Sequence, residues 1–321
     1  MDALASFLDG PRARAAFLLR VVMDPPFCIQ VEDEAPLSLV AVTHGSCTVT
    51  GADGEVVTLA EGDVLLARGP DHYVMADAPD RDPQVVILPG QVCRPPDGVD
   101  VKVADVLGTR TWGSAVDGGV TMLIGTYERA SEVSRRLLDA LPPLVVIRAG
   151  SWDTALVDLL AAEIGRDEPG QDAVLDRLLD LLLVSALRTW LARPEAAAPA
   201  WYRAHGDPVV GHALRALHDR PAEAWTVASL AREVGVSRAT LARRFGEQVG
   251  ETPMAYLTEW RLALAADLLR EPDATVSGVA RQVGYGSGFA LSAAFSRVRG
   301  VSPSEHRARA AAAEPPVPTP V

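Results

Sequence analysis

Two similar stretches decide the fold: residues 226–253 read TVASLAREVGVSRATLARRFGEQVGETP, and residues 275–303 read TVSGVARQVGYGSGFALSAAFSRVRGVSP. Each begins with Thr-Val, carries an Ala-Arg-x-Val-Gly run and ends on a proline. On both sides of that glycine, apolar residues recur at the three- and four-residue spacing of a helix that buries one face. The sequence therefore predicts two copies of one helical unit in the last third of the chain.

Each copy has the local signals of two helices joined by a tight turn. In the first copy, Thr226 and Ser237 can each cap a helix, because a hydroxyl oxygen can accept a hydrogen bond from a backbone amide. Gly235 lies between them, and glycine accepts the positive φ of a tight turn at little cost. This is the layout of a helix-turn-helix, whose second helix enters the DNA major groove. The predicted inward positions are Val227, Leu230, Ala231, Val234, Leu241 and Phe245, then Val276, Val279, Ala280, Val283, Leu291 and Phe295.

An amphipathic helix over 253–269 joins the two copies, and the stretch 225–307 resembles the DNA-binding domain of AraC/XylS-type transcription regulators. The residues that follow the closing signature of that family are Val283-Gly284-Tyr285, Ala294-Phe295, Gly300-Val301-Ser302-Pro303 and Arg307. The resemblance implies an all-α DNA-binding domain over 207–310 with helix-turn-helix units at 226–248 and 275–298. It also implies double-stranded DNA and RNA polymerase as partners, and it favours an activator.

Composition sets limits on the class of protein. The 321 residues are 48 % hydrophobic, which is enough for two domains that each have a core. The formal net charge is −12, but residues 207–310 hold 13 arginines and 11 acidic side chains, a net charge of +2. Because this basic excess is small, we expect DNA affinity to need a dimer or a partner. We expect no signal peptide, no membrane span and a cytoplasmic location.

The N-terminal part reads as a small β-barrel with flanking helices, so the predicted fold class is a two-domain α+β protein. We expect a helix over 1–23, then short strands between 27 and 89, with Asp53-Gly54 as a hairpin turn. Two further helices are expected at 151–164 and 172–191. The second of these is apolar on more than one face through Val174, Leu178, Leu181, Leu182, Ser185 and Leu187.

Residues 1–193 resemble the cupin-type sensor domain of one subgroup of AraC regulators. The resemblance is carried by Gly62-Asp63, Leu65-Leu66, Pro70 with His72, Gly118-Gly119 through Tyr127, and the run from Leu141 to Leu144. It implies a sensor and dimerisation domain for an unknown small-molecule effector, with a homodimer formed through this region. We expect a linker over 194–206 and a disordered, proline-rich tail over 311–321.

The rival interpretation is a metal-dependent cupin enzyme with an appended helical domain. Enzymatic cupins resemble one another in a His-x-His motif, which is missing here, and His44 and His72 alone cannot complete a metal site. We therefore expect no enzyme activity, no metal and no cofactor, and keep both histidines as candidate ligand contacts. Cys47 and Cys93 are kept as candidate redox sensors, since some members of this sensor group are similar in using cysteine oxidation. A third interpretation makes this domain a protein-interaction module.

The resemblance also implies which residues contact DNA. In the first unit, Ala239, Ala242 and Arg243 would face base edges, and Arg238, Thr240 and Arg244 the DNA backbone. In the second, the groove-facing positions are Gly288, Phe289, Ala290 and Ala293, with Ser287 and Ser292 toward phosphates. The second unit departs from the family because it offers no arginine or other long polar side chain at these positions. We expect the first unit to specify sequence and the second mainly to position the protein.

Overall fold

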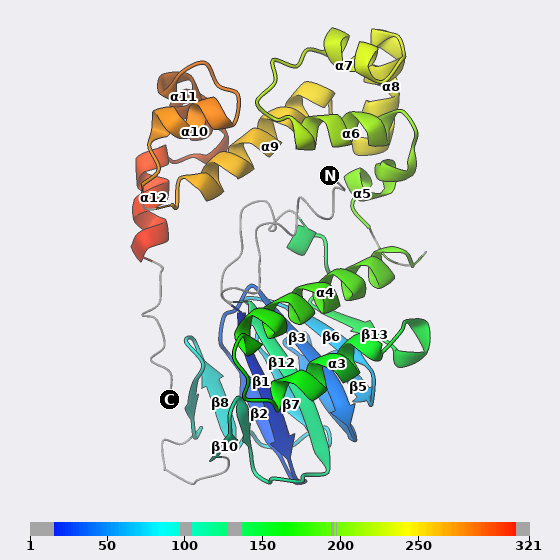
Figure 1. Ribbon diagram of the computed structural model, residues 1–321, viewed down its shortest axis with the longest axis vertical. Coiled ribbons are helices and arrows are strands. Elements are labelled where there is room, and N and C mark those ends of the chain that lie inside the picture. Colours follow the sequence, from blue (N-terminus) through cyan, green and yellow to red (C-terminus); the bar gives the residue numbers. More distant parts are fainter. Residues whose placement is uncertain are drawn as a thin grey trace. The chain divides into compact units, whose positions relative to one another are not determined.

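The computed structural model describes residues 16–96, 105–127, 137–193, 196, 198–271 and 273–312. The chain divides into a β-rich unit within residues 11–130 and 138–197 and a helical unit that includes residues 198–315 (Figure 1). This confirms the predicted two-domain α+β fold, with a β-rich first domain and an all-α second domain. Of the predicted tail, 311 and 312 end a helix, and the remainder lies outside the described residues.

The β-rich unit has two sheets that share one apolar core. The strand orders are β10-β11-β1-β12-β3-β6-β13 and β5-β4-β7-β2-β8-β9. Val42 of β3, Val49 of β4 and Met75 of β7 lie in the same buried cluster. As predicted, β4 and β5 form an antiparallel hairpin around Asp53-Gly54. The strands are β1 (Ala16–Met23), β2 (Cys28–Val31), β3 (Leu37–His44), β4 (Ser46–Gly51), β5 (Val56–Ala60), β6 (Val64–Arg68), β7 (Tyr73–Ala76), β8 (Val85–Leu88), β9 (Val92–Arg94), β10 (Asp105–Gly108), β11 (Thr111–Gly113), β12 (Val120–Tyr127) and β13 (Leu144–Ile147).

Strand β1 corrects the prediction of a helix over residues 1–23. Residues 16–23 pair antiparallel with β12, from Ala16 opposite Tyr127 to Met23 opposite Val120. The described part of the strand is buried or half-buried throughout, because the core covers one face and helix α3 contacts the other. A strand covered on both faces has a continuous apolar run, which periodicity cannot distinguish from a buried helix. Residues 1–15 lie outside the described residues.

Two helices, α3 (Ala155–Ile164) and α4 (Gln171–Leu191), pack together and cover the first sheet. The close approach depends on Gly125 of β12, because a Cβ there would lie 2.7 Å from Cδ1 of Leu179. The sequence predicted apolar residues on more than one face of α4, and the side chains of Val174 and Leu181 are 45 % and 50 % exposed. The helix has more apolar surface than one sheet can cover, so a stripe remains in solvent.

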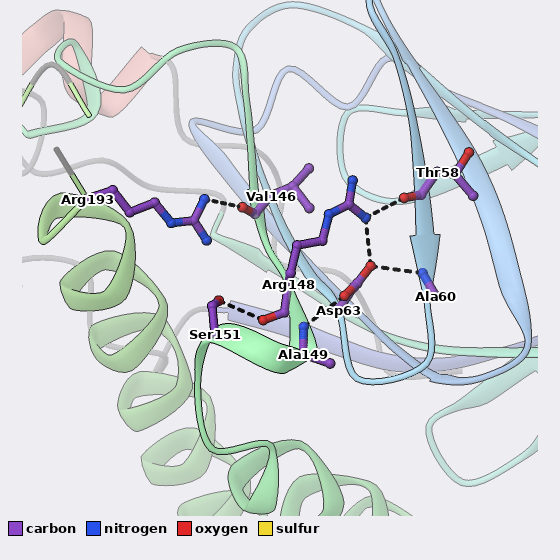
Figure 2. Close-up of polar contacts among 8 residues, drawn as sticks. All are labelled: Thr58, Ala60, Asp63, Val146, Arg148, Ala149, Ser151 and Arg193. Atoms are coloured by element: carbon purple, nitrogen blue, oxygen red, sulfur yellow. Dashed lines mark hydrogen bonds and ion pairs between the residues drawn. The ribbon is translucent and has the colours of Figure 1, made fainter. Parts of the chain in front are cut away.

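Asp63 ties the β5–β6 turn to the segment that follows β13 (Figure 2). Its carboxylate accepts hydrogen bonds from the amides of Ala60 (3.0 Å) and Ala149 (2.9 Å) and from the guanidinium of Arg148 (2.8 Å). Arg148 also donates to the carbonyl of Thr58 at 2.6 Å. Burial acts to raise the pKa of Asp63, but these hydrogen bonds and the neighbouring charge hold it below its ordinary value. The Gly62-Asp63 pair singled out in the sequence therefore has a structural role.

The helical unit is built on α9, which spans Pro253–Leu268 and contacts both α8 and α10. Its buried side chains include Tyr256, Leu257 and Trp260. The other helices are α5 (Ala200–Arg203), α6 (Val210–Asp219), α7 (Val227–Glu233), α8 (Arg238–Val249), α10 (Val276–Gln282), α11 (Gly288–Arg299) and α12 (Pro303–Ala312), with a 3-10 turn at Ala204–Gly206.

The segment expected to be a linker over 194–206 differs from that expectation in its second half. Residues 200–206 are helical, and α5 contacts α8. The side chain of Trp201 is only 5 % exposed. Burial of an indole removes a large apolar area from water, so this segment folds as part of the helical unit.

Candidate nucleic-acid interface

The first helix-turn-helix unit consists of α7 and α8, and each predicted local signal is present. The Thr226 hydroxyl accepts a hydrogen bond from the amide of Ser229 at 3.0 Å and caps α7. Ser237 accepts from the amide of Thr240 at 3.1 Å and caps α8. Between the helices, Gly235 has a φ of +70°. The inward positions Leu241 and Phe245 are fully buried.

The second unit, α10 and α11, repeats this construction. Thr275 caps α10 by accepting from the amide of Gly278 at 3.1 Å, and Ser287 caps α11 by accepting from Ala290 at 3.2 Å. Gly284 makes the turn with a φ of +83°. Val279, Ala280, Val283, Leu291 and Phe295 are buried in a cluster with Leu262, Ala265 and Ala266 of α9 and with Leu269, which directly follows that helix. Both units therefore present the opposite face of their second helix to solvent.

The outward face of α8 carries small side chains and arginines. Arg238, Ala239, Ala242 and Arg243 are exposed, and Thr240 and Arg244 are half-buried. Arg243 donates from Nη1 to both carboxylate oxygens of Glu247, at 3.0 and 2.9 Å. This pair is exposed and one helical turn apart, so it is weak and the guanidinium can exchange it for another acceptor.

Arg244 has a different environment from Arg243. It donates to Oδ2 of Asp207 at 2.6 Å, and Gln248 donates to the same oxygen at 2.8 Å. The other carboxylate oxygen accepts the amides of Val209 and Val210, both at 2.8 Å, at the start of α6. Burial opposes ionisation of Asp207, but hydrogen bonds from Gln248, Val210, Val209 and Arg244 lower its pKa to about 2. Sequence analysis missed this contact, although an Asp just before a helix is a recognisable capping signal.

The outward face of α11 is apolar. Phe289 is 85 % exposed, and Ala290 and Ala293 are exposed beside it. Ser292 uses its hydroxyl to donate to the carbonyl of Gly288 at 2.8 Å. Gly288 is half-buried, and a Cβ there would lie 2.9 Å from Oγ of Ser277. A contact from this helix to a base pair would therefore be made by an aromatic ring or a methyl group.

The structure does not bring together the candidate ligand residues His44 and His72. His44 precedes β4 and is exposed, whereas His72 directly precedes Tyr73, which pairs with Gly51 at the far end of β4. The length of β4 between them corresponds to about 20 Å at roughly 3.3 Å per residue. Within the described ranges, no group of three or more His, Cys, Asp or Glu side chains could hold a metal ion.

The candidate redox cysteines lie on different strands and in different environments. Cys47 of β4 is buried, its Sγ lies 3.7 Å from Sδ of Met122, and burial raises the pKa of its thiol to about 12. Cys93 is exposed on β9, which β7, β2 and β8 separate from β4. A reactive cysteine needs a lowered pKa, so Cys47 is a poor nucleophile.

Comparison with known families covers most of the chain. The family model described as "Cupin" matches residues 2–192, and the one described as "Helix-turn-helix domain" matches residues 230–309. No helix in the described part of the chain has the length and apolar character needed to cross a membrane.

Two curated relatives are similar to this chain over nearly their whole length. A "Putative AraC-like transcription regulator" of Streptomyces lividans is 34 % identical over 96 % of this chain and 98 % of its own. The "HTH-type transcriptional regulator AlkR" of Acinetobacter baylyi is 30 % identical over 96 % of this chain and 99 % of its own. A solved structure of the AdpA DNA-binding domain with a target DNA is 33 % identical, covering 33 % of this chain and 96 % of that one, with a TM-score of 0.32.

Proposed function

Because this chain belongs to the AraC-like transcription regulators, we propose that α8 and α11 read successive segments of the DNA major groove. The observation that carries the proposal is the pair of capped helix-turn-helix units on one connecting helix, α9, each with the outer face of its second helix in solvent. A second helix held in this way is the element that enters the groove in such motifs.

The two reading helices have unequal chemistry, so we propose unequal roles for them. Arg243 can exchange Glu247 for guanine, because a guanidinium matches the O6 and N7 acceptors of that base. Arg238 would contact phosphate beside it. The exposed ring of Phe289 can contact a thymine methyl group, which discriminates less strongly. Thus α8 specifies sequence and α11 mainly positions the protein, with Ser287, Ser292 and the α11 N-terminus toward phosphates.

The test is base-by-base binding selection with the full-length protein and the variant Arg243→Ala. Loss of one bidentate contact should weaken binding by about 1–3 kcal/mol and relax preference at one base pair. Arg309→Ala is the matched control, because Arg309 is also exposed but lies on α12. The control should lower affinity slightly at every sequence. Equally sharp base preferences over both segments would exclude unequal roles.

We propose that the protein is a homodimer formed through the β-rich domain. The support is the exposed apolar stripe on α3 and α4, which includes Leu159, Val174 and Leu181. Leu181→Glu should give a monomer in analytical ultracentrifugation without unfolding the domain, because the side chain is already in solvent. Val116→Glu, at another exposed valine of the same domain, should leave the dimer intact. A dimeric L181E protein would place the interface elsewhere.

We propose that the cupin domain senses a small molecule and is not an enzyme. The domain assignment and the relatives, which are transcription regulators, support this role. The raised pKa of Cys47 argues against thiol oxidation there as the signal. Thermal stabilisation by a candidate metabolite would support ligand sensing, whereas stabilisation only by a protein partner would favour an interaction module. Bound metal with turnover of a substrate would revive the enzyme interpretation.

We further propose that DNA-bound dimers recruit RNA polymerase and activate transcription in the cytoplasm. The modest net charge of +2 over residues 207–310 supports a need for a second contact besides DNA. Transcription from a promoter that carries the selected site, with and without the protein, tests this step. Reduced transcript levels would identify a repressor.

A further inference from the structure

The turn of the second helix-turn-helix unit touches the loop that leads into the first. A Cβ placed on Gly284 would lie 2.7 Å from Cα and 2.8 Å from the carbonyl oxygen of Ala222. Ala222 belongs to the loop between α6 and α7. Two backbones, 62 positions apart in the chain, are therefore in direct contact at this point.

Arg261 of α9 holds the same loop and turn together. Its Nε donates to the carbonyl of Pro221 at 2.7 Å, and its Nη2 donates to the carbonyl of Glu223, also at 2.7 Å. The guanidinium carbon lies 6.0 Å from the ring centroid of Tyr285, directly after Gly284. Hydrogen bonds from a charged donor are stronger than neutral ones, and these two attach the loop to α9 on both sides of Ala222.

The corresponding turn of the first unit has no such contact. Gly235 has a similar φ of +70°, but apart from its chain neighbours a Cβ there would meet no heavy atom within 4 Å. Both glycines adopt a positive φ without the steric cost that a residue with a side chain would have there. Only Gly284, at a φ of +83°, is also required for close approach of a second segment.

We infer that Gly284, Ala222 and Arg261 form a junction that fixes the two reading helices relative to each other and so sets the spacing between their DNA segments. The inference rests on the proposed function. The apolar cluster of α9, α10 and α11 already holds the second unit to α9, and the junction adds a contact to the loop that enters α7. One inserted base pair moves a DNA segment by about 3.4 Å and rotates it by about 35°. If the junction is rigid, α8 and α11 cannot shift and rotate relative to each other to match that change.

The experiment measures affinity of the full-length protein for the selected site and for sites with one base pair inserted or removed between the two segments. The variants are Gly284→Ala, its matched control Gly235→Ala, and Arg261→Ala. Wild type should lose about tenfold or more in affinity on the altered sites. In G284A and R261A, this spacing penalty should fall at least threefold or the preferred spacing should change. G235A should weaken binding at all spacings equally.

The outcomes separate this inference from the proposed function. If wild-type protein shows no base preference in a second segment, the two-segment function itself fails. If wild type discriminates spacing and both junction variants keep the same discrimination, the junction inference is overturned. Thermal unfolding of each variant shows whether the domain still folds. R261A tests the junction independently, because it removes the hydrogen bonds to the loop without placing a Cβ between Gly284 and Ala222.

Discussion

Replacing Asp207 with alanine should loosen the first reading helix. Its carboxylate caps α6 through the amides of Val209 and Val210 and accepts hydrogen bonds from Arg244 and Gln248 of α8. Loss of a helix cap costs about 1 kcal/mol. Loss of the two side-chain hydrogen bonds adds roughly 1–2 kcal/mol. This is at the low end of the usual range for such bonds, because Arg244 is partly exposed and can donate its hydrogen bond to water instead. The expected total is about 2–3 kcal/mol.

The assay is hydrogen exchange of the full-length protein, read peptide by peptide. A loss of this size should lower protection in α6 and α8 by roughly 30- to 150-fold, because local opening follows the local free energy. Peptides from α10 and α11 should change much less. Asp207→Asn keeps an acceptor for the amides and should show a smaller loss, and the exposed Asp273→Ala serves as the control. Unchanged protection in α8 after Asp207→Ala would refute the assigned coupling.

The same contact should depend on pH. The pKa of Asp207 is about 2 in the folded protein, below its ordinary value of 3.8. A carboxylate with a lowered folded pKa contributes stability that is complete above the unfolded value and is lost as pH falls through the folded one. The difference in stability between wild type and Asp207→Asn should therefore be constant above about pH 5 and shrink between about pH 4 and 2. A constant difference throughout this range would contradict the linkage.

Three further predictions concern other contacts. Glu247→Gln should raise DNA affinity about twofold in fluorescence anisotropy. In this variant, Arg243 binds DNA without first giving up its ion pair with Glu247, which is worth about 0.3–0.5 kcal/mol. Asp63→Ala should lower the unfolding free energy of the cupin domain by about 2–3 kcal/mol in chemical denaturation, because two amides and the guanidinium of Arg148 lose their shared acceptor. Cys47 should resist alkylation in native protein at pH 8, as measured by mass spectrometry of the labelled peptides, because its pKa is raised to about 12.

Each of these predictions has a contrary result. Unchanged affinity of E247Q would mean that Arg243 does not leave Glu247 when DNA binds. Wild-type stability of D63A would mean that water replaces the carboxylate without cost. Rapid labelling of Cys47, at the rate of the exposed Cys93, would show that its thiol is reactive and would support cysteine oxidation as the sensed signal.

The helix-turn-helix units were predictable because their signals are local. A cap such as Ser237 acts on an amide three residues away, Gly235 acts on its own φ, and Leu241 and Phe245 lie one turn apart. The strands between β2 and β8 were predictable for the same reason. The helix expected at 16–23 was wrong because a strand with both faces covered has no period of two for the sequence to display.

The sequence by itself determined the two helix-turn-helix units and the β-rich first domain, since periodicity, caps and turn glycines act over a few residues. Only the tertiary structure decided that His44 and His72 lie apart, that Arg244 binds Asp207, and that Gly284 contacts Ala222. The two contacts join residues that are 37 and 62 positions apart. Their formation depends on the packing of whole elements, which local patterns do not encode.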